Sequence, residues 1–548
     1  MRTTRRVLAA VLAASALVAV AGCTAGTTSA GGTRADTIIF GKSDGGTTYV
    51  RNYNVLGPAT EKAPNAELIY EPLARIDYAN GAVVEPWLAE SLDFDESGTQ
   101  LTIDIRDDVT FSDGEALTAD DVAYSLSLPL ERPELNLAGV TYAGVEKVDD
   151  DTVQVSFDEP SFAALNQFAS SSLPMVPEHI WKDQDLTTWT NPDPVGTGPF
   201  TLDAFAAQQV TLKARDDYWG GKLPMAYMKI LATSGETVKA QLLRGDVDWA
   251  PVGWPNAEQE FVAQNPETNL YQLYATGGAY SMMYNTAQAP FDDVNVRRAF
   301  AMSIPRSDIT ATLNRPGTEA GPTGLVDQIY SDWIAPEYQG MVQEVDADAA
   351  VAALAASGYE VVDGALVKDG KSFTPRLSFN QDFGWNAYAD IMINSWKKVL
   401  GVTVAPAGAP GATLYDQQKT GDFDLTIATT GGAGVYGVYS FLDSRYVEPL
   451  GTAAATNIGR WNDSETDEVL AQMTRAADEA TMKDLGMQMQ RIVVDEVPFS
   501  PLYNSYWFVD VNASHWKGWP TPDDFDAVPF PSLGPDTIRT LLSLPPAS

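Results

Sequence analysis

The sequence contains only one cysteine, Cys23, and only two histidines, His179 and His515, in 548 residues. A single cysteine cannot form an internal disulfide, so we expect the fold to be stabilised by packing in a large core. Metal clusters of the Cys/His type are excluded, and a Ser-His-Asp triad would have to use one of two histidines without a nucleophile-elbow motif. We therefore predict no catalytic residue, no metal ligand and no cofactor.

Basic side chains are also scarce, with 35 Lys and Arg against 73 Asp and Glu and a net charge of −38. An acidic surface of this kind repels nucleic acid, so no nucleic-acid partner is expected. A glycoside hydrolase needs only two carboxylates, and this enzyme class stays open as a less favoured alternative. After the first 22 residues no stretch is long and apolar enough to predict a membrane-spanning helix.

The first 36 residues have the pattern of a bacterial lipoprotein leader. A basic start is followed by the uncharged run from Val7 to Gly22, which closes on Val20-Ala21-Gly22-Cys23 and resembles a lipobox. Residues 1–22 are predicted to be a signal peptide, and Cys23 is predicted to carry the lipid, because a thiol can form the required thioether. Residues 23–36 would form a lipidated tether, whose Thr24–Thr33 segment of Thr, Ala, Gly and Ser reaches roughly 20 Å. Whether export follows the general or the twin-arginine route stays open.

Strand and helix patterns alternate along the remaining chain. Leu101–Ile105 and Val153–Phe157 have the period of a half-buried strand, and Thr37–Phe40 starts the folded part. Thr118 with Asp121 forms a capping-box signal for a helix, and Asp346 precedes an alanine-rich helix that should end at Gly358. Such a mixture predicts an α/β fold with mixed sheets, divided into two or three domains.

From about residue 66 the chain resembles the family 5 extracellular solute-binding proteins, which include dipeptide, oligopeptide, nickel and oligosaccharide receptors of ABC importers. The resemblance rests on ordered blocks: residues 68–77, 86–91, 105–125, 196–200, 215–219, 245–248, 290–300 and 496–502. It implies a two-lobed periplasmic-binding-protein-like fold of type II with an extra domain and a hinge between the lobes. It also implies a monomer that delivers a solute to ABC permease and ATPase subunits, with the lipid anchor on the extracytoplasmic side of the membrane.

The family architecture further implies three domains. Domain I would consist of residues 37–66, 195–285 and 505–548, domain II would be an insertion of residues 67–194, and domain III would span residues 286–504. The ligand would lie between lobes that close by hinge motion.

The loop after the strand-like segment Phe423–Ile427 bears on the ligand. In peptide-binding relatives an aspartate here pairs with the peptide's amino terminus, and the corresponding position is Ala433. No acidic residue occurs from Leu425 to Leu442, and an unpaired buried ammonium costs several kcal/mol. The neutral loop Thr429–Tyr436 is similar in character to that of oligosaccharide-binding members, and so is the segment Trp516–Asp524 near the end of the chain.

Sugars are bound by aromatic faces and a few directional hydrogen bonds. The predicted ligand contacts lie in loops at the expected cleft edges: Trp254, Trp385, Trp507, Tyr436, Tyr53 and, through its hydroxyl, Thr430. We therefore expect a neutral oligosaccharide, such as a β-glucoside, as the solute. An oligopeptide or dipeptide is the alternative, and a ligand-sensing lipoprotein is less favoured.

Overall fold

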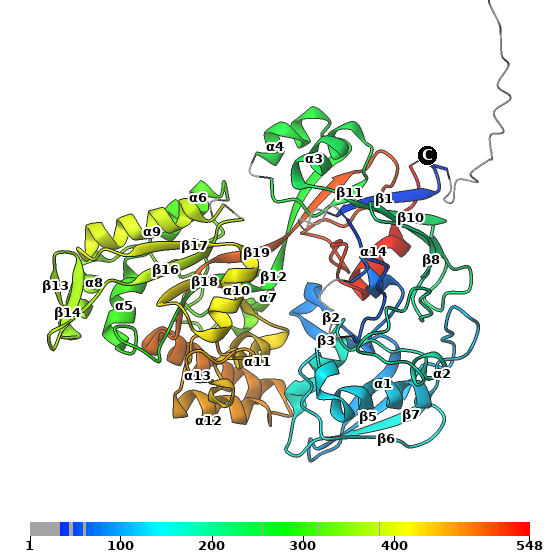
Figure 1. Cartoon of the computed structure of the whole chain (residues 1–548), viewed down its shortest axis with the longest axis horizontal. Coiled ribbons are helices and arrows are strands. Elements are labelled where there is room, and N and C mark those ends of the chain that lie inside the picture. Colours follow the sequence, from blue (N-terminus) through cyan, green and yellow to red (C-terminus); the bar gives the residue numbers. More distant parts are fainter. Residues whose placement is uncertain are drawn as a thin grey trace, which may run out of the picture.

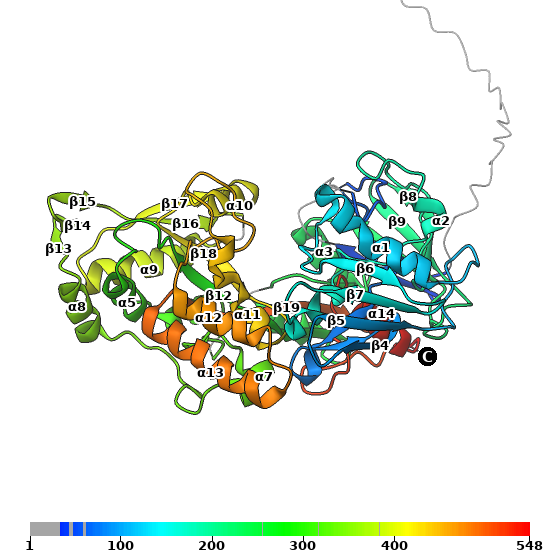
Figure 2. The same ribbon diagram turned by 90° about the horizontal axis from the view of Figure 1, so that it is seen from below.

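The computed structural model describes residues 33–42, 48–57, 62–254, 256–315, 317–382 and 384–547. Two lobes lie side by side, and two long antiparallel strands cross from one to the other (Figures 1 and 2). These strands are β12 (Asn269–Tyr284) and β19 (Phe499–Asn512). The described residues before β12 and after β19 build the first lobe, and the residues between these two strands build the second lobe (Figure 1).

One ten-stranded sheet runs through both lobes, in the order β17-β16-β18-β12-β19-β11-β1-β10-β9-β8. Its other strands are β1 (Thr37–Lys42), β8 (Phe200–Ala206), β9 (Gln209–Ala214), β10 (Tyr227–Ala232), β11 (Trp249–Ala250), β16 (Arg376–Asn380), β17 (Ala405–Ala409) and β18 (Leu425–Gly431). Strand β1 pairs in parallel with β10 and β11, and β16 pairs in parallel with β17 and β18. The remaining pairs are antiparallel. The prediction of an α/β fold with mixed sheets is confirmed.

Three smaller sheets complete the strand inventory of the described chain. The first lobe carries the sheet β4-β5-β7-β6 and the hairpin β2-β3, and the second lobe carries β13-β14-β15. Their strands are β2 (Ala74–Asp77), β3 (Val83–Pro86), β4 (Ala89–Phe94), β5 (Gln100–Ile105), β6 (Gly144–Lys147), β7 (Thr152–Ser156), β13 (Glu360–Val362), β14 (Ala365–Lys368) and β15 (Lys371–Phe373).

Helices cover the sheets of both lobes (Figure 1). The first lobe contains α1 (Ala119–Glu131), α2 (Glu178–Trp181), α3 (Gly235–Arg244), α4 (Ala257–Glu260) and α14 (Pro535–Ser543). The second contains α5 (Val294–Met302), α6 (Arg306–Thr312), α7 (Asp327–Tyr330), α8 (Ala347–Ala356), α9 (Asn386–Val399), α10 (Gly411–Thr420), α11 (Gly434–Tyr439), α12 (Ser464–Met473) and α13 (Glu479–Glu496). Among the described residues, no helix has the length and apolar character needed to cross a bilayer.

The local signals in the sequence produce the elements they predict. The capping box of α1 is formed, with the Asp121 carboxylate accepting from the Thr118 backbone N–H at 3.0 Å. Asp346 caps α8 by accepting from the backbone N–H of Ala349, and Gly358 follows in the left-handed conformation with φ +75°. Both helix ends therefore follow from side-chain chemistry close in sequence.

The crossing between the lobes is irregular at a run of glycines in β12. The register of β12 against β19 shifts between Ala275 and Ala279. A Cβ on Gly278 would lie 1.7 Å from the Thr430 carbonyl oxygen, and one on Gly277 would lie 2.6 Å from the Gly432 carbonyl oxygen. Only glycine allows the backbones to approach this closely, at the point where the family resemblance implies a hinge.

Several predictions concern the beginning of the chain. The signal peptide 1–22 and Cys23 lie outside the described residues, and so does the predicted tether up to residue 32. The last residues of that tether are described, and Arg34 forms an ion pair with Asp248, Nη2 to Oδ1 at 2.6 Å. The division into three domains stays a prediction.

Candidate functional site

An aromatic cluster lies where β12 and β19 enter the second lobe. Tyr280 and Tyr503 are paired across the two strands, and their rings stack with centroids 4.9 Å apart and an interplanar angle of 28°. Trp385, which immediately precedes α9, meets the Tyr280 ring edge-on at 5.4 Å. Tyr388 on α9 meets Tyr503 at 6.4 Å. These four side chains, Tyr280, Trp385, Tyr388 and Tyr503, are called the aromatic floor below.

A pocket of about 390 Å³, here called the second-lobe pocket, adjoins the aromatic floor at the carboxyl ends of β16 and β18. It is lined by Trp385, by the exposed Tyr415 and the half-buried Lys419 from α10, and by the exposed Thr429 from β18. In both views α10 lies at the end of the second lobe nearest the first lobe (Figures 1 and 2). Carboxyl ends of parallel strands are where open α/β sheets bind ligands.

The charge of the second-lobe pocket is distinctive in so acidic a chain. Lys419 is the one charged residue in its described lining, and no carboxylate lines it. The Lys419 ammonium lies 4.4 Å from the centroid of the Tyr415 ring, so it is held by an aromatic face. Neutral hydroxyls and amides therefore supply most of the polar groups, among them Thr429 and Asn380.

A second pocket, the inter-lobe pocket, has a volume of about 300 Å³ and is built from both lobes. The first lobe contributes Trp254 and Glu258 near α4 and Tyr271 from β12, and the second lobe contributes Arg315 after α6. The Arg315 guanidinium carbon lies 4.2 Å from the centroid of the Phe508 ring. A group that fills this pocket would touch both lobes.

A third pocket of about 480 Å³ also combines residues of both lobes. Tyr78, Tyr274 and Tyr506 line it together with Asp523 and Asp524. This pocket differs from the second-lobe pocket because two exposed carboxylates stand at its edge.

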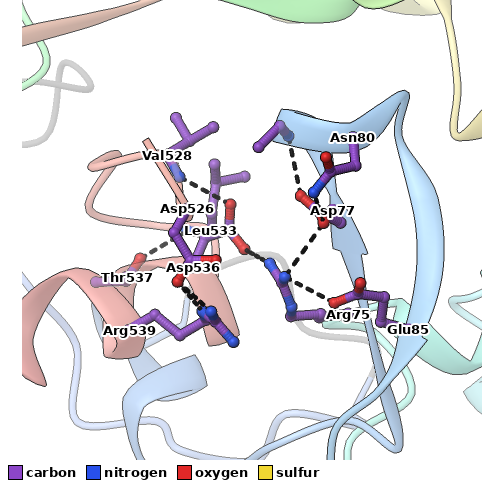
Figure 3. A network of polar contacts seen from close by, with 11 residues as sticks. Arg75, Asp77, Asn80, Glu85, Asp526, Val528, Leu533, Asp536, Thr537 and Arg539 are labelled. Carbon is purple, nitrogen blue, oxygen red and sulfur yellow. Dashed lines mark hydrogen bonds and ion pairs between the residues drawn. The ribbon is translucent and has the colours of Figure 1, made fainter. Parts of the chain in front are cut away.

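The hairpin β2-β3, whose connecting segment begins at Tyr78, is joined to α14 by a charge network around the buried Arg75. The Arg75 guanidinium contacts Asp536 at 3.2 Å, Glu85 at 2.7 Å and Asp77 at 3.5 Å (Figure 3). The Asp536 carboxylate also accepts from the Val528 backbone N–H at 2.9 Å. Burial raises the pKa of Asp536 to about 6, and the nearby Arg75 opposes that rise.

Two of the predicted ligand residues belong to the second-lobe pocket region. Trp385 lines the pocket with 9% of its surface exposed. Thr430 is 4% exposed, and its hydroxyl already bonds to the Ser281 hydroxyl at 2.9 Å. Its neighbour Thr429 lines the pocket, whereas Thr430 does not.

Two further predicted residues lie in other surroundings. Trp254 lines the inter-lobe pocket but is only 4% exposed, and its indole N–H donates to the Glu260 carboxylate at 2.7 Å. Tyr436 on α11 is half-buried, and burial raises the pKa of its hydroxyl to about 12. Both assignments stay predictions.

The last two predicted aromatics belong to the first lobe. Trp507 is half-buried and meets the ring of Tyr78 edge-on at 4.7 Å, so it supports a residue of the third pocket. Tyr53 is 0% exposed, and a ligand would reach it only if the surrounding core opened. In the segment Trp516–Asp524, both tryptophans are buried, and Pro522, Asp523 and Asp524 are its pocket-lining residues.

Several residues of the pockets and of the aromatic floor gave no signal in the sequence. Arg315 follows a short helix, and Tyr415 stands in the polar helix α10, where nothing distinguishes it from an ordinary surface residue. Tyr280 and Tyr503 are far apart in sequence and meet only through the pairing of β12 with β19. Exposure and strand pairing, which are tertiary properties, identify these residues.

Comparison with known proteins defines the class. Residues 83–448 match the profile of the bacterial extracellular solute-binding proteins, family 5. Heme-binding protein A of Haemophilus influenzae is 25% identical over 511 residues, which cover 84% of this chain and 86% of the relative. Oligopeptide-binding protein OppA of Bacillus subtilis is 24% identical over 477 residues, covering 81% of this chain and 84% of the relative.

Solved structures show the same two-lobed fold. A periplasmic oligopeptide-binding protein of an ABC transporter from Thermotoga maritima has a TM-score of 0.82 and 22% identity, covering 94% of this chain and 100% of that chain. The mannohexaose-bound structure of that protein has a TM-score of 0.78, with 94% and 99% covered.

The chain belongs to the bacterial extracellular solute-binding proteins, family 5. As a member of this family it is an extracellular solute-binding protein.

Proposed function

We propose that this protein captures a neutral oligosaccharide between its lobes and delivers it to a membrane permease. The observation that carries the proposal is the second-lobe pocket, where aromatic rings and neutral polar groups meet without any carboxylate in the described lining. Tyr415 is 57% exposed, so its ring is available to pack against the apolar face of a sugar ring. Thr429 and Asn380 supply donors and acceptors for sugar hydroxyls.

The same pocket is unsuited to a peptide's amino terminus. A buried ammonium needs a partner of opposite charge, and burying it without one costs several kcal/mol. The one charged side chain in the described lining is that of Lys419, which would repel the ammonium. The mannohexaose-bound Thermotoga maritima structure supports the choice of a sugar at the level of fold.

A peptide is the second candidate, and the third pocket favours it. Asp523 and Asp524 stand at the edge of that pocket, where they could receive an ammonium group. The name of the Bacillus subtilis relative, an oligopeptide-binding protein, points the same way.

Calorimetry of the full mature chain with two panels of probes separates the candidates. We expect binding of cello-, xylo- or manno-oligosaccharides with dissociation constants in the micromolar range or below, and no heat from tri- to hexapeptides. Submicromolar binding of a peptide, with no response to any sugar, would reject the oligosaccharide proposal.

Two exposed tyrosines of the second lobe provide a matched pair of variants. Tyr415 lines the pocket and has a lysine over its ring. Tyr446 does not line the pocket, is 36% exposed and has Arg445 over its ring at 6.0 Å. We expect Tyr415→Ala to weaken oligosaccharide binding about tenfold, equivalent to about 1.4 kcal/mol. Tyr446→Ala should bind like the wild type. Equal affinities for both variants would remove Tyr415 from the site.

The lipid anchor forms part of the proposal. Cys23 would attach the protein to the membrane, and the ion pair between Arg34 and the fully buried Asp248 would fix where the tether joins the first lobe. Cys23→Ser should move the protein from the detergent phase to the aqueous phase in phase partitioning of whole cells. Retention of the variant in the detergent phase would contradict anchoring through this cysteine.

A further inference from the structure

Arg315 stands out in the inter-lobe pocket because its charge has no ion-pair partner among the described residues. The chain has 73 acidic residues against 35 basic ones, so a carboxylate partner is easy to supply. Arg34 pairs with Asp248 and Arg75 pairs with Asp536. In contrast, no carboxylate among the described residues forms an ion pair with Arg315, whose one ring contact is the face of Phe508 at 4.2 Å.

Hydrogen bonds fix the backbone of Arg315, and neighbouring side chains surround its guanidinium. Its backbone N–H donates to the Thr310 carbonyl at 2.8 Å, and its own carbonyl accepts from the Thr318 hydroxyl at 2.7 Å. Burial raises the pKa of the Tyr271 hydroxyl, and Arg315 opposes the rise through its charge and a side-chain hydrogen bond. The guanidinium is therefore half-buried between an aromatic face and a neutral hydroxyl, with donors left for a ligand.

One acid lines the same pocket from the other lobe. Glu258 on α4 is exposed and does not pair with Arg315, although both line the cavity of about 300 Å³. Its charge should therefore weaken the binding of an anion without cancelling the guanidinium.

We propose that Arg315 binds a carboxylate of the transported solute. A guanidinium recognises a carboxylate through two parallel hydrogen bonds, which neutral hydroxyls match less well. The pocket is built from both lobes, so this contact would also stabilise their closed arrangement. The inference rests on the proposed function for the position of the ligand, and it adds an acidic end to an otherwise neutral oligosaccharide. A uronate residue of a sugar and the terminal carboxylate of a peptide share this chemistry.

Calorimetry with two pairs of probes tests the inference. The sugar pair is xylotetraose and a xylo-oligosaccharide of equal length that carries glucuronate, and the peptide pair is tetra-alanine and tetra-alanine amide. For the wild type we expect the acidic sugar to bind at least tenfold more tightly than the neutral one. Arg315→Gln should reduce affinity for the acidic probe at least tenfold more than affinity for the neutral probe. Glu258→Gln should strengthen binding of the acidic probe a few-fold.

The outcomes separate this inference from the proposed function. Equal affinities of the wild type for both sugars, or equal losses for both in Arg315→Gln, would overturn the carboxylate site while leaving an oligosaccharide receptor. Binding of tetra-alanine but not of its amide, with no response to sugars, would overturn the proposed function and support the carboxylate site. Arg315→Lys keeps the positive charge but lacks the two parallel N–H donors of the guanidinium, so an intermediate affinity for the acidic probe supports bidentate binding. No binding of any carboxylate probe by a folded wild type would reject the site.

Discussion

We predict that Asp536 makes the stability of the first lobe depend on pH. Its carboxylate is 3% exposed and contacts Arg75 at 3.2 Å, in the network that joins α14 to the hairpin β2-β3 (Figure 3). Burial raises the pKa of Asp536 from 3.8 to about 6. In the variant Asp536→Asn the side chain no longer titrates, and Arg75 keeps its contacts with Asp77 and Glu85.

The direction of the pH dependence follows from which state, folded or unfolded, loses the Asp536 proton first. The folded pKa is above the unfolded one, so the unfolded state loses its proton first as the pH rises. The free energy of unfolding therefore falls between about pH 4 and pH 6 and is constant above that range. The full difference corresponds to about 3 kcal/mol, of which about 2 kcal/mol falls between about pH 4.5 and pH 7.

The assay is urea unfolding of wild type and Asp536→Asn, followed by tryptophan fluorescence at several pH values from 4.5 to 7.5. We expect the wild type to lose about 2 kcal/mol relative to the variant across this range. Asp526→Asn is the matched control, because Asp526 pairs with Arg539 from a side chain that is 73% exposed, and exposed pairs contribute little. A difference between wild type and Asp536→Asn that stays constant across the range would refute the reasoning.

Three further predictions concern stability. Gly278→Ala should destabilise the junction of the lobes by roughly 1–3 kcal/mol, since the new Cβ would lie 1.7 Å from the Thr430 carbonyl oxygen. Gly235→Ala is the control and should not destabilise the protein, because a Cβ there has nothing within 4 Å. Similar melting temperatures for the two variants would count against the tight packing at Gly278. Trp396→Ala removes a 0% exposed side chain from the second-lobe core and should cost about 3–5 kcal/mol in urea unfolding, and a loss below about 1 kcal/mol would contradict this. Glu71→Leu leaves three aromatic donors without their acceptor and should cost at least about 3 kcal/mol, which wild-type stability of the variant would disprove.

The elements that the sequence predicts are those determined by close neighbours. Thr118 and Asp121 are three positions apart, and their hydrogen bond starts α1 wherever the helix packs. Gly196 and Gly198 belong to blocks that carry the family resemblance, and added Cβ atoms would lie 2.1 Å from the Ile69 carbonyl oxygen and 2.4 Å from that of Leu68. Their steric need for glycine explains why such blocks identify the fold.

The ligand site was predicted less well because exposure depends on tertiary packing. Trp385 and Tyr53 have similar aromatic character in the sequence, yet one lines a pocket and the other is 0% exposed. Thr430 and Thr429 are neighbours on β18, yet only Thr429 lines the pocket, while Thr430 is 4% exposed and bonds to Ser281. Arg315 becomes distinctive only when it is known that no carboxylate of the described residues forms an ion pair with it.

Small-angle X-ray scattering of the full mature chain tests the central claim most directly, because capture between two lobes requires that they close on the solute. The radius of gyration should decrease when cellohexaose or mannohexaose is added to the wild type at saturating concentration. It should stay unchanged with tetra-alanine, and Tyr415→Ala should need about tenfold more sugar to reach the same decrease. A radius of gyration that is unchanged by any oligosaccharide, or that decreases only with the peptide, would contradict the account.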